Sequence, residues 1–129
     1  MRKLVESILE DYSSKEVFLF RATCVSCGTE YASRPVLFSK FGVSPATQNK
    51  EIIYEAVFEQ EHRAARQTAI RDVAEHMNYC PICKKLVCNR CFLICDDLDM
   101  CRRCALRLGE TGRPVLPEIA EATSEEEIR

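Results

Sequence analysis

The sequence predicts an α+β fold, a small domain with short β-hairpins and one long inserted helix. Two β-prone segments, residues 17–23 and 31–38, lie on either side of a cysteine pair. Apolar side chains recur at helical intervals across residues 50–78. With 129 residues, of which 47% are hydrophobic, the chain can bury about two-thirds of its unfolded surface.

The N-terminal segment, residues 1–16, is predicted to form an amphipathic helix ahead of a main domain at 17–108. Packing against the rest of the chain is the simpler interpretation, and binding to a partner is the alternative. The C-terminal segment, 109–129, has six acidic and two basic residues and two prolines, so we expect an acidic, disordered tail. The apolar residues with helical spacing near the N-terminus are Leu4, Val5, Ile8 and Leu9.

The two extended segments differ in their expected place in a sheet. Residues 17–23 are rich in β-branched and aromatic side chains and are predicted to form a strand. Pro35 interrupts residues 31–38, which is typical of an edge strand. Residues 39–49 contain a glycine and a proline and are expected to form a loop.

The predicted long helix, residues 50–78, is an insertion between the first and second cysteine pairs. At about 1.5 Å per residue it would extend roughly 40 Å, which is long for a domain of this size. We therefore expect part of it to project, bend or pack against another chain. His62 stands among charged residues and is expected to be solvated, whereas His76 is expected at the helix C-terminus, where the dipole favours it.

Nine cysteines in 129 residues require a chemical explanation, either disulfides or metal. The N-terminal residues contain acids where a secretory signal has its apolar core, so we expect a reducing, cytoplasmic location. Eight of the nine cysteines form Cys-x-x-Cys pairs, a spacing typical of metal sites. Two intervening residues allow both sulfurs of a pair to reach one ion.

The gaps between the pairs restrict which pairs can share an ion. Only four residues separate Cys83 from Cys88, so these neighbouring pairs are expected to serve different ions. Pairing the first with the fourth and the second with the third is the alternative, but it requires that short connector to close around one ion. The preferred assignment is Cys24, Cys27, Cys88 and Cys91 for site 1, and Cys80, Cys83, Cys101 and Cys104 for site 2.

The run Cys80-Pro-Ile-Cys83-Lys-Lys-Leu-Val-Cys88-Asn-Arg-Cys91, followed after nine residues by Cys101-Arg-Arg-Cys104, resembles a known motif. It is similar to the cross-brace, treble-clef-like double zinc fingers of the FYVE, RING and PHD group, with spacing closest to FYVE fingers. The resemblance covers about a quarter of the chain and implies two interleaved zinc sites. The stretch 74–80 lacks the basic, His-containing motif with which FYVE fingers bind lipid, and all eight expected ligands are cysteines, unlike those of most RING fingers.

The predicted cofactors are two Zn²⁺ ions, with iron as the alternative for four-thiolate sites. The expected fold is therefore a small zinc-stabilised domain. Sites closed by four thiolates leave no position for water, and no catalytic set is evident, so we do not expect an enzyme. Binding two ions through eight thiolates would change the formal charge from −2 to −6, because eight negative charges are gained and four positive charges added.

Several residues near the cysteines allow a second interpretation. Cys95 is unpaired and is expected to be a buried, inert thiol, with a redox role as the alternative. The loop with Asp96, Asp97 and Asp99 is expected to be hydrated rather than to bind a cation. The basic residues that flank the cysteines are expected to balance the charge of the thiolates, with nucleic-acid contact as the alternative. They are Lys84, Lys85, Arg90, Arg102 and Arg103.

These observations favour a non-enzymatic structural or adaptor module that mediates protein–protein interaction as a subunit of a larger assembly. The long helix is the expected contact, either with a partner protein or with a second copy. We do not expect binding of membrane or of a small-molecule substrate, and the acidic net charge disfavours nucleic acid. The alternatives are a nucleic-acid-binding zinc ribbon, a RING-like ubiquitin ligase and a thiol-redox protein using Cys95.

Overall fold

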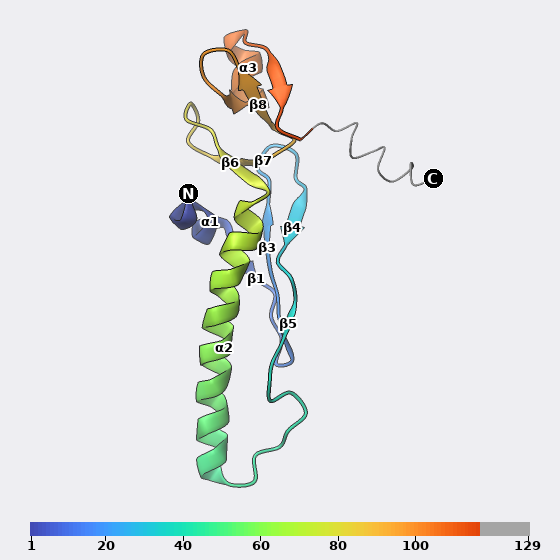
Figure 1. Ribbon diagram of the computed structural model, residues 1–129, viewed down its shortest axis with the longest axis vertical. Coiled ribbons are helices and arrows are strands. Elements are labelled where there is room, and N and C mark those ends of the chain that lie inside the picture. Colours follow the sequence, from blue (N-terminus) through green and yellow to red (C-terminus); the bar gives the residue numbers. More distant parts are fainter. Residues whose placement is uncertain (117–129) are drawn as a thin grey trace, which may run out of the picture. The chain divides into compact units, whose positions relative to one another are not determined.

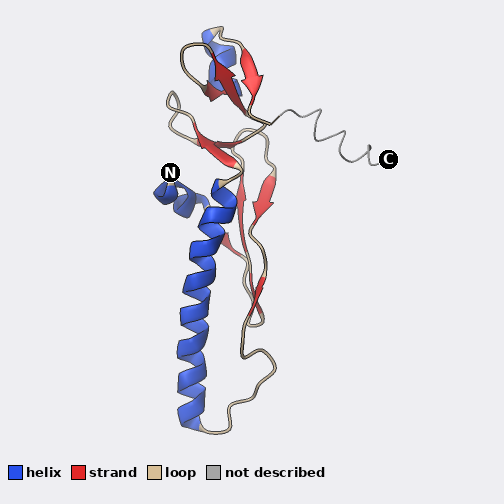
Figure 2. Cartoon of the chain, viewed as in Figure 1, coloured by secondary structure: helices blue, strands red, loops and turns tan. Residues whose placement is uncertain are grey.

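The computed structural model describes residues 1–116, and these residues form an α+β fold with short antiparallel strands and one long helix (Figures 1 and 2). The predicted fold class is thereby confirmed. The chain divides into two compact units. The cysteine unit consists mainly of residues 23–30 and 76–116, and the helical unit consists of residues 2–22 and 31–75. No helix among the described residues is long and apolar enough to cross a membrane.

The helical unit is organised around α2 (Gln48–Ala74), against which α1 (Arg2–Ile8) packs through the buried Val5. The helix α2 begins after Thr47, whose hydroxyl accepts a hydrogen bond from the Lys50 backbone N–H at 3.1 Å. Such an N-cap satisfies one of the amide groups that have no partner in the first helical turn.

The predicted helix 50–78 was wrong at its C-terminal end. The helix α2 ends at Ala74, and residues 77–79 form strand β6 (Met77–Tyr79), which pairs with β7 (Leu86–Cys88). Val73 and Met77 are four residues apart, a spacing that fits a helix. The residues that pair with β6 belong to β7, later in the chain, so the pattern within residues 50–78 does not reveal the hairpin. His76 therefore follows the helix instead of closing it.

The N-terminal helix is also shorter than the predicted segment 1–16, because α1 ends at Ile8 and Glu10–Asp11 form β1. The predicted strand 17–23 divides into β2 (Val17–Phe18) and β3 (Phe20–Thr23), and the segment 31–38 divides into β4 (Glu30–Ala32) and β5 (Val36–Leu37). The strand β3 lies between β1 and β4, whereas β2 pairs with β5.

The core of the helical unit is a cluster of aromatic and small side chains. Phe18 and Phe20 pack against Ala65 and Ala69 of α2. His62 was predicted to be solvated, but its ring lies 5.6 Å from that of Phe18 and 5.4 Å from that of Phe20. Its Nε2 lies 2.8 Å from Asp11 Oδ2, so the ring packs against the core while its polar edge reaches the β1 carboxylate.

The cysteine unit contains the hairpin β6–β7 and a second sheet in which β8 (Phe92–Cys95) lies between β9 (Met100–Cys101) and β10 (Gly112–Pro114). The short helix α3 (Arg102–Leu108) ends at Gly109, whose φ of 73° closes the helix in the left-handed conformation. The expected tail at 109–129 thus begins with a paired strand, and its remainder, 117–129, lies outside the described residues.

Candidate metal centres

The eight paired cysteines gather into two clusters in the cysteine unit, and within each cluster the four sulfurs lie within 4.8 Å of one another. The pairs alternate along the chain, the first with the third and the second with the fourth. No ligand role follows from proximity alone, so the assignment of these residues as metal ligands stays a prediction. Cluster 1 is Cys24, Cys27, Cys88 and Cys91, and cluster 2 is Cys80, Cys83, Cys101 and Cys104.

The distances between sulfurs test whether a single ion fits each cluster. Four sulfurs at about 2.3 Å from a tetrahedral ion lie about 3.8 Å from one another. In cluster 1, Cys88 Sγ lies 3.6 Å from Cys27 Sγ and 3.7 Å from Cys91 Sγ. In cluster 2, two pairs of sulfurs are each 3.9 Å apart, Cys80 with Cys104 and Cys83 with Cys101. A disulfide would bring two sulfurs to about 2.0 Å, and all nine cysteines are free thiols.

The turns that hold the first two pairs have the same backbone hydrogen bonds. Gly28 N–H donates to Cys24 O and Lys84 N–H donates to Cys80 O, both at 2.8 Å. In each turn the first cysteine N–H also donates to the carbonyl five residues later, at 2.9 Å. Gly28 and Lys84 both have left-handed φ values, 78° and 65°. The two turns are therefore a structural repeat, which the sequence does not reveal because lysine gives no signal for positive φ.

Each turn sulfur also accepts a hydrogen bond from the segment that completes its cluster. Cys88 N–H donates to Cys24 Sγ at 3.2 Å, and Cys101 N–H donates to Cys80 Sγ at 3.3 Å. Amide donors stabilise a negatively charged sulfur and orient it toward a metal. The second cluster also has a side-chain donor, the Arg107 guanidinium, which lies 3.7 Å from Cys104 Sγ.

Within each cluster the thiols differ from one another in pKa. Burial raises the pKa of Cys91, and it also raises those of Cys101 and Cys104. Cys27 is exposed; burial acts to raise its pKa, but hydrogen bonds with Thr29, Cys88 and Cys91 together outweigh this effect and bring the pKa to about 6. The pKa of Cys80 is lowered to about 7, because backbone hydrogen bonds from Cys83, Cys101 and Ile82 together exceed the opposing effect of burial. Each cluster thus has a thiol that loses its proton near neutral pH, the form in which cysteine binds metal.

The chemistry of both clusters is that of a closed metal site. Four cysteine sulfurs complete a tetrahedral shell, and neither cluster includes a histidine or a carboxylate. The cysteine clusters indicate metal binding, and the arrangement is consistent with a zinc-finger-like site.

The remaining residues singled out in the sequence lie outside both clusters. Cys95 is half-buried in β8, and burial together with the charges of Glu110 and Asp99 raises the pKa of its thiol. A raised pKa leaves little thiolate at neutral pH and so disfavours a redox role. Asp99 accepts a hydrogen bond from Cys95 N–H at 3.0 Å, which gives this carboxylate a structural function in the hairpin. His76 is exposed, and its carbonyl accepts a bond from Asn89 N–H.

The basic residues flanking the cysteines make several hydrogen bonds to the chain. Arg90 donates to Thr29 Oγ1 at 3.2 Å, Arg102 donates to Arg90 O at 2.7 Å, and Arg103 donates to Ser26 O at 3.5 Å. These bonds join the turn at 24–29 to the segments that carry the third and fourth pairs.

Comparison with known proteins gives no relative for this chain: no family model, no curated protein and no solved structure matches it.

Proposed function

We propose that this protein is a non-enzymatic adaptor whose shape is fixed by two zinc ions and which binds other proteins as a subunit of a larger assembly. In this proposal the cysteine unit is a cross-brace double zinc finger similar to those of the FYVE, RING and PHD group. The observation that carries it is the pair of closed, four-sulfur clusters with spacings suited to one ion each. The free thiols suit the reducing cytoplasm, where we place the protein.

Zinc is favoured over iron by the geometry and by the expected function. A cluster of several iron atoms would hold its thiolates farther apart, because the four thiolates are divided among two or more irons. The sulfur separations of 3.6–3.9 Å instead suit a single tetrahedral ion. A structural site gains nothing from a metal that changes oxidation state, and zinc has no redox chemistry. A single iron ion would reveal itself by visible absorption, whereas zinc is colourless.

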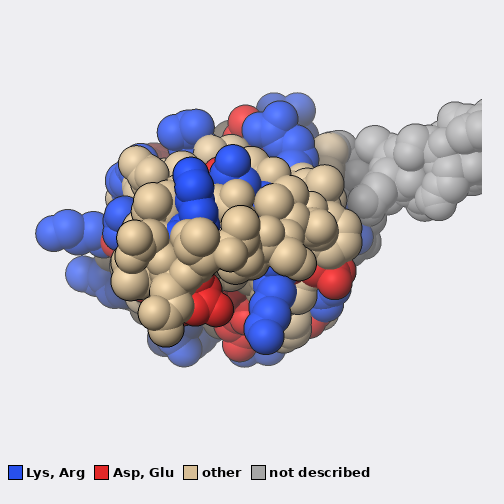
Figure 3. Space-filling model, turned by 90° about the horizontal axis from the view of Figure 1, so that it is seen from below, with Lys and Arg blue, Asp and Glu red and all other residues tan. Residues whose placement is uncertain are grey.

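The proposed protein-binding surface is the uncovered N-terminal part of α2 and the loop before it. Residues 48–64 of α2 contain no buried side chain, although the sequence there includes several apolar residues. Ile52 is 66% exposed and Ile53 is 48% exposed. Figure 3 views this end of the helical unit and shows a face of mostly uncharged residues with a few charged side chains among them.

The proposed protein-binding surface includes a groove in the helical unit. Its volume is about 360 Å³, and its apolar walls come from α2 and from the loop between β5 and α2. Phe41 and Val43 of that loop are about half exposed. Exposed apolar side chains that gather in one place mark interaction sites more often than single ones do. The apolar residues lining the groove are Phe38, Val43, Pro45, Tyr54 and Phe58.

The experiment measures association of the purified full chain by size-exclusion chromatography with light scattering, together with pull-down from the source cells. The variant Ile52→Asp places a charge on the proposed surface and should abolish self-association or partner capture. Leu106→Asp is the matched control, because Leu106 is an aliphatic side chain of α3 that is 83% exposed. A protein that stays monomeric and captures no partner contradicts the proposal, and so does equal loss of association in both variants.

A further inference from the structure

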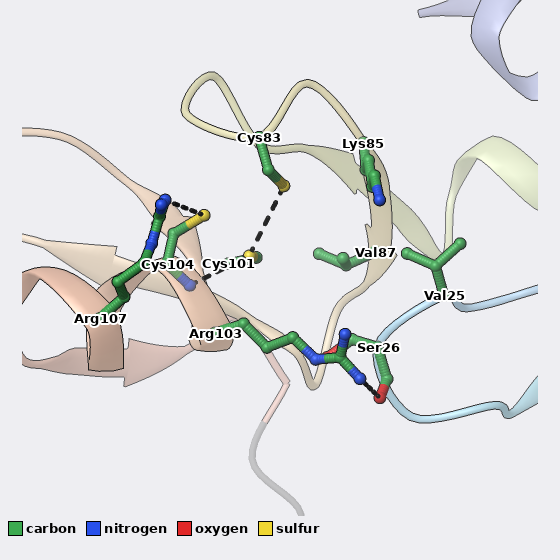
Figure 4. Close-up of a pocket in the computed structure, with 9 residues that line it drawn as sticks. All are labelled: Val25, Ser26, Cys83, Lys85, Val87, Cys101, Arg103, Cys104 and Arg107. Carbon is green, nitrogen blue, oxygen red and sulfur yellow. Dashed lines mark hydrogen bonds between the residues drawn. The ribbon is translucent and has the colours of Figure 1, made fainter.

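A basic pocket lies beside cluster 2 within the cysteine unit (Figure 4). Its volume is about 330 Å³, within the size range of ligand-binding clefts. Three cations line it, Lys85 from the turn before β7 and both Arg103 and Arg107 from α3. Three cysteines of cluster 2, Cys83, Cys101 and Cys104, also line it, and no aspartate or glutamate does. All three side chains are exposed, so the pocket opens to solvent.

The cations exceed what cluster 2 alone requires. Four thiolates and one divalent ion leave a charge of −2, and Arg107 meets part of it through its contact with Cys104 Sγ. Among the residues that the structure describes, the Arg103 guanidinium makes a single long hydrogen bond of 3.5 Å, to Ser26 O, which leaves most of its five donors available. The Lys85 ammonium makes no ion pair or hydrogen bond with any residue that the structure describes. Lys85 and Arg103 are therefore positioned to meet an anion.

The pocket also has an apolar wall. Val25 is 51% exposed at its edge, and Val87 is buried at its base. In Figure 4 the end of the Lys85 side chain points toward the side chains of these two valines, while Arg103 extends on the opposite side of them toward Ser26. A ligand that matches both the cations and the apolar wall has an anionic group next to an apolar side chain.

We propose that this pocket binds an acidic peptide segment of a partner protein, with a carboxylate on Lys85 and Arg103 and a neighbouring apolar side chain on Val25. A peptide fits better than nucleic acid because the basic side chains line a single pocket, whereas a phosphate backbone needs cations along an extended path. The inference is independent of the α2 surface, which lies on the other unit.

The test uses the full-length, zinc-loaded protein and a fluorescein-labelled peptide, Ser-Glu-Glu-Val-Glu-Glu-Ser, in fluorescence anisotropy at two salt concentrations. Lys85→Glu and Arg103→Glu should each weaken binding at least about tenfold, because each replaces a charge-assisted contact with repulsion. Arg113→Glu is the matched control: it makes the same charge change on β10, outside the pocket, and should change the affinity less than about twofold. The same peptide with glutamine in place of glutamate should not bind.

Three results would overturn the proposal. The first is no peptide binding, and the second is a loss of peptide affinity in Arg113→Glu equal to that in the pocket variants. The third is a single-stranded oligonucleotide that binds more tightly than the peptide and whose binding is abolished by the Lys85 variant. Zinc content measured on every variant distinguishes a variant that has lost only peptide binding from one that no longer folds. Lys85→Gln is a second variant that removes the charge of this exposed side chain without reversing it. Ile52→Asp should leave peptide affinity unchanged. Failure of the α2 proposal and failure of this one are thereby distinguishable.

Discussion

Replacing Cys88 by serine should weaken metal binding at cluster 1 and leave cluster 2 intact. Cys88 is fully buried, and its sulfur lies 3.6 and 3.7 Å from those of Cys27 and Cys91, so it is central to the cluster. Structural zinc contributes about 10–16 kcal/mol in zinc-finger peptides, and one of four ligands therefore represents about 3 kcal/mol. At 1.4 kcal/mol per factor of ten, this corresponds to a loss of about 100-fold in affinity at one site.

The assay is competition with a chromophoric chelator, which reports the affinity of each bound ion in turn. Wild-type protein should release two ions, whereas Cys88→Ser should lose one ion about 100-fold more easily and keep the other unchanged. Cys95→Ser is the matched control, because Cys95 belongs to neither cluster, and it should behave as wild type. Two tightly held ions in Cys88→Ser, or loss of an ion in Cys95→Ser, would refute the assignment of cluster 1.

Three further changes test other parts of the structure. Lys84→Gly should raise the thermal midpoint of the zinc-loaded protein by the equivalent of about 1 kcal/mol, because glycine adopts the left-handed φ of 65° without strain. Gly112→Val should detach β10, measured as faster amide exchange of β8, because even a Cβ at this position would lie 2.5 Å from a backbone oxygen of β8. Hydrogen bonding by Arg34 lowers the pKa of Asp72 in the folded protein. The ionised carboxylate therefore stabilises the fold at any pH above its ordinary pKa of about 3.9, and this stabilisation is lost as the pH falls through the lowered pKa. Asp72→Asn should therefore lower the urea midpoint at pH 7, and its difference from wild type should vanish in strong acid.

The sequence predicted best the features that depend on short separations along the chain. A Cys-x-x-Cys pair brings its own sulfurs together, and the four-residue connector between Cys83 and Cys88 restricts which pairs can share an ion. The structure places the cysteines in the groups that this connector argument gives. The start of α2 was also predicted to within two residues, because apolar side chains recur at helical intervals near its beginning.

Features that depend on distant residues were missed. The last residues of the predicted helix 50–78 pair with β7 instead, and the strand β10 forms within a segment that its acidic composition marks as a tail. His62 was predicted to be solvated because its neighbours in the helix are charged, but in the structure its ring packs beside those of Phe18 and Phe20. A local pattern does not contain these contacts, and tertiary packing decides them.

Native mass spectrometry of the full-length protein, purified without chelator and with no added metal, tests the central claim most directly. The account predicts a single dominant species that carries two zinc ions, and loss of both ions should abolish the cooperative unfolding transition of the cysteine unit. A chain that carries no metal and still unfolds cooperatively would contradict it.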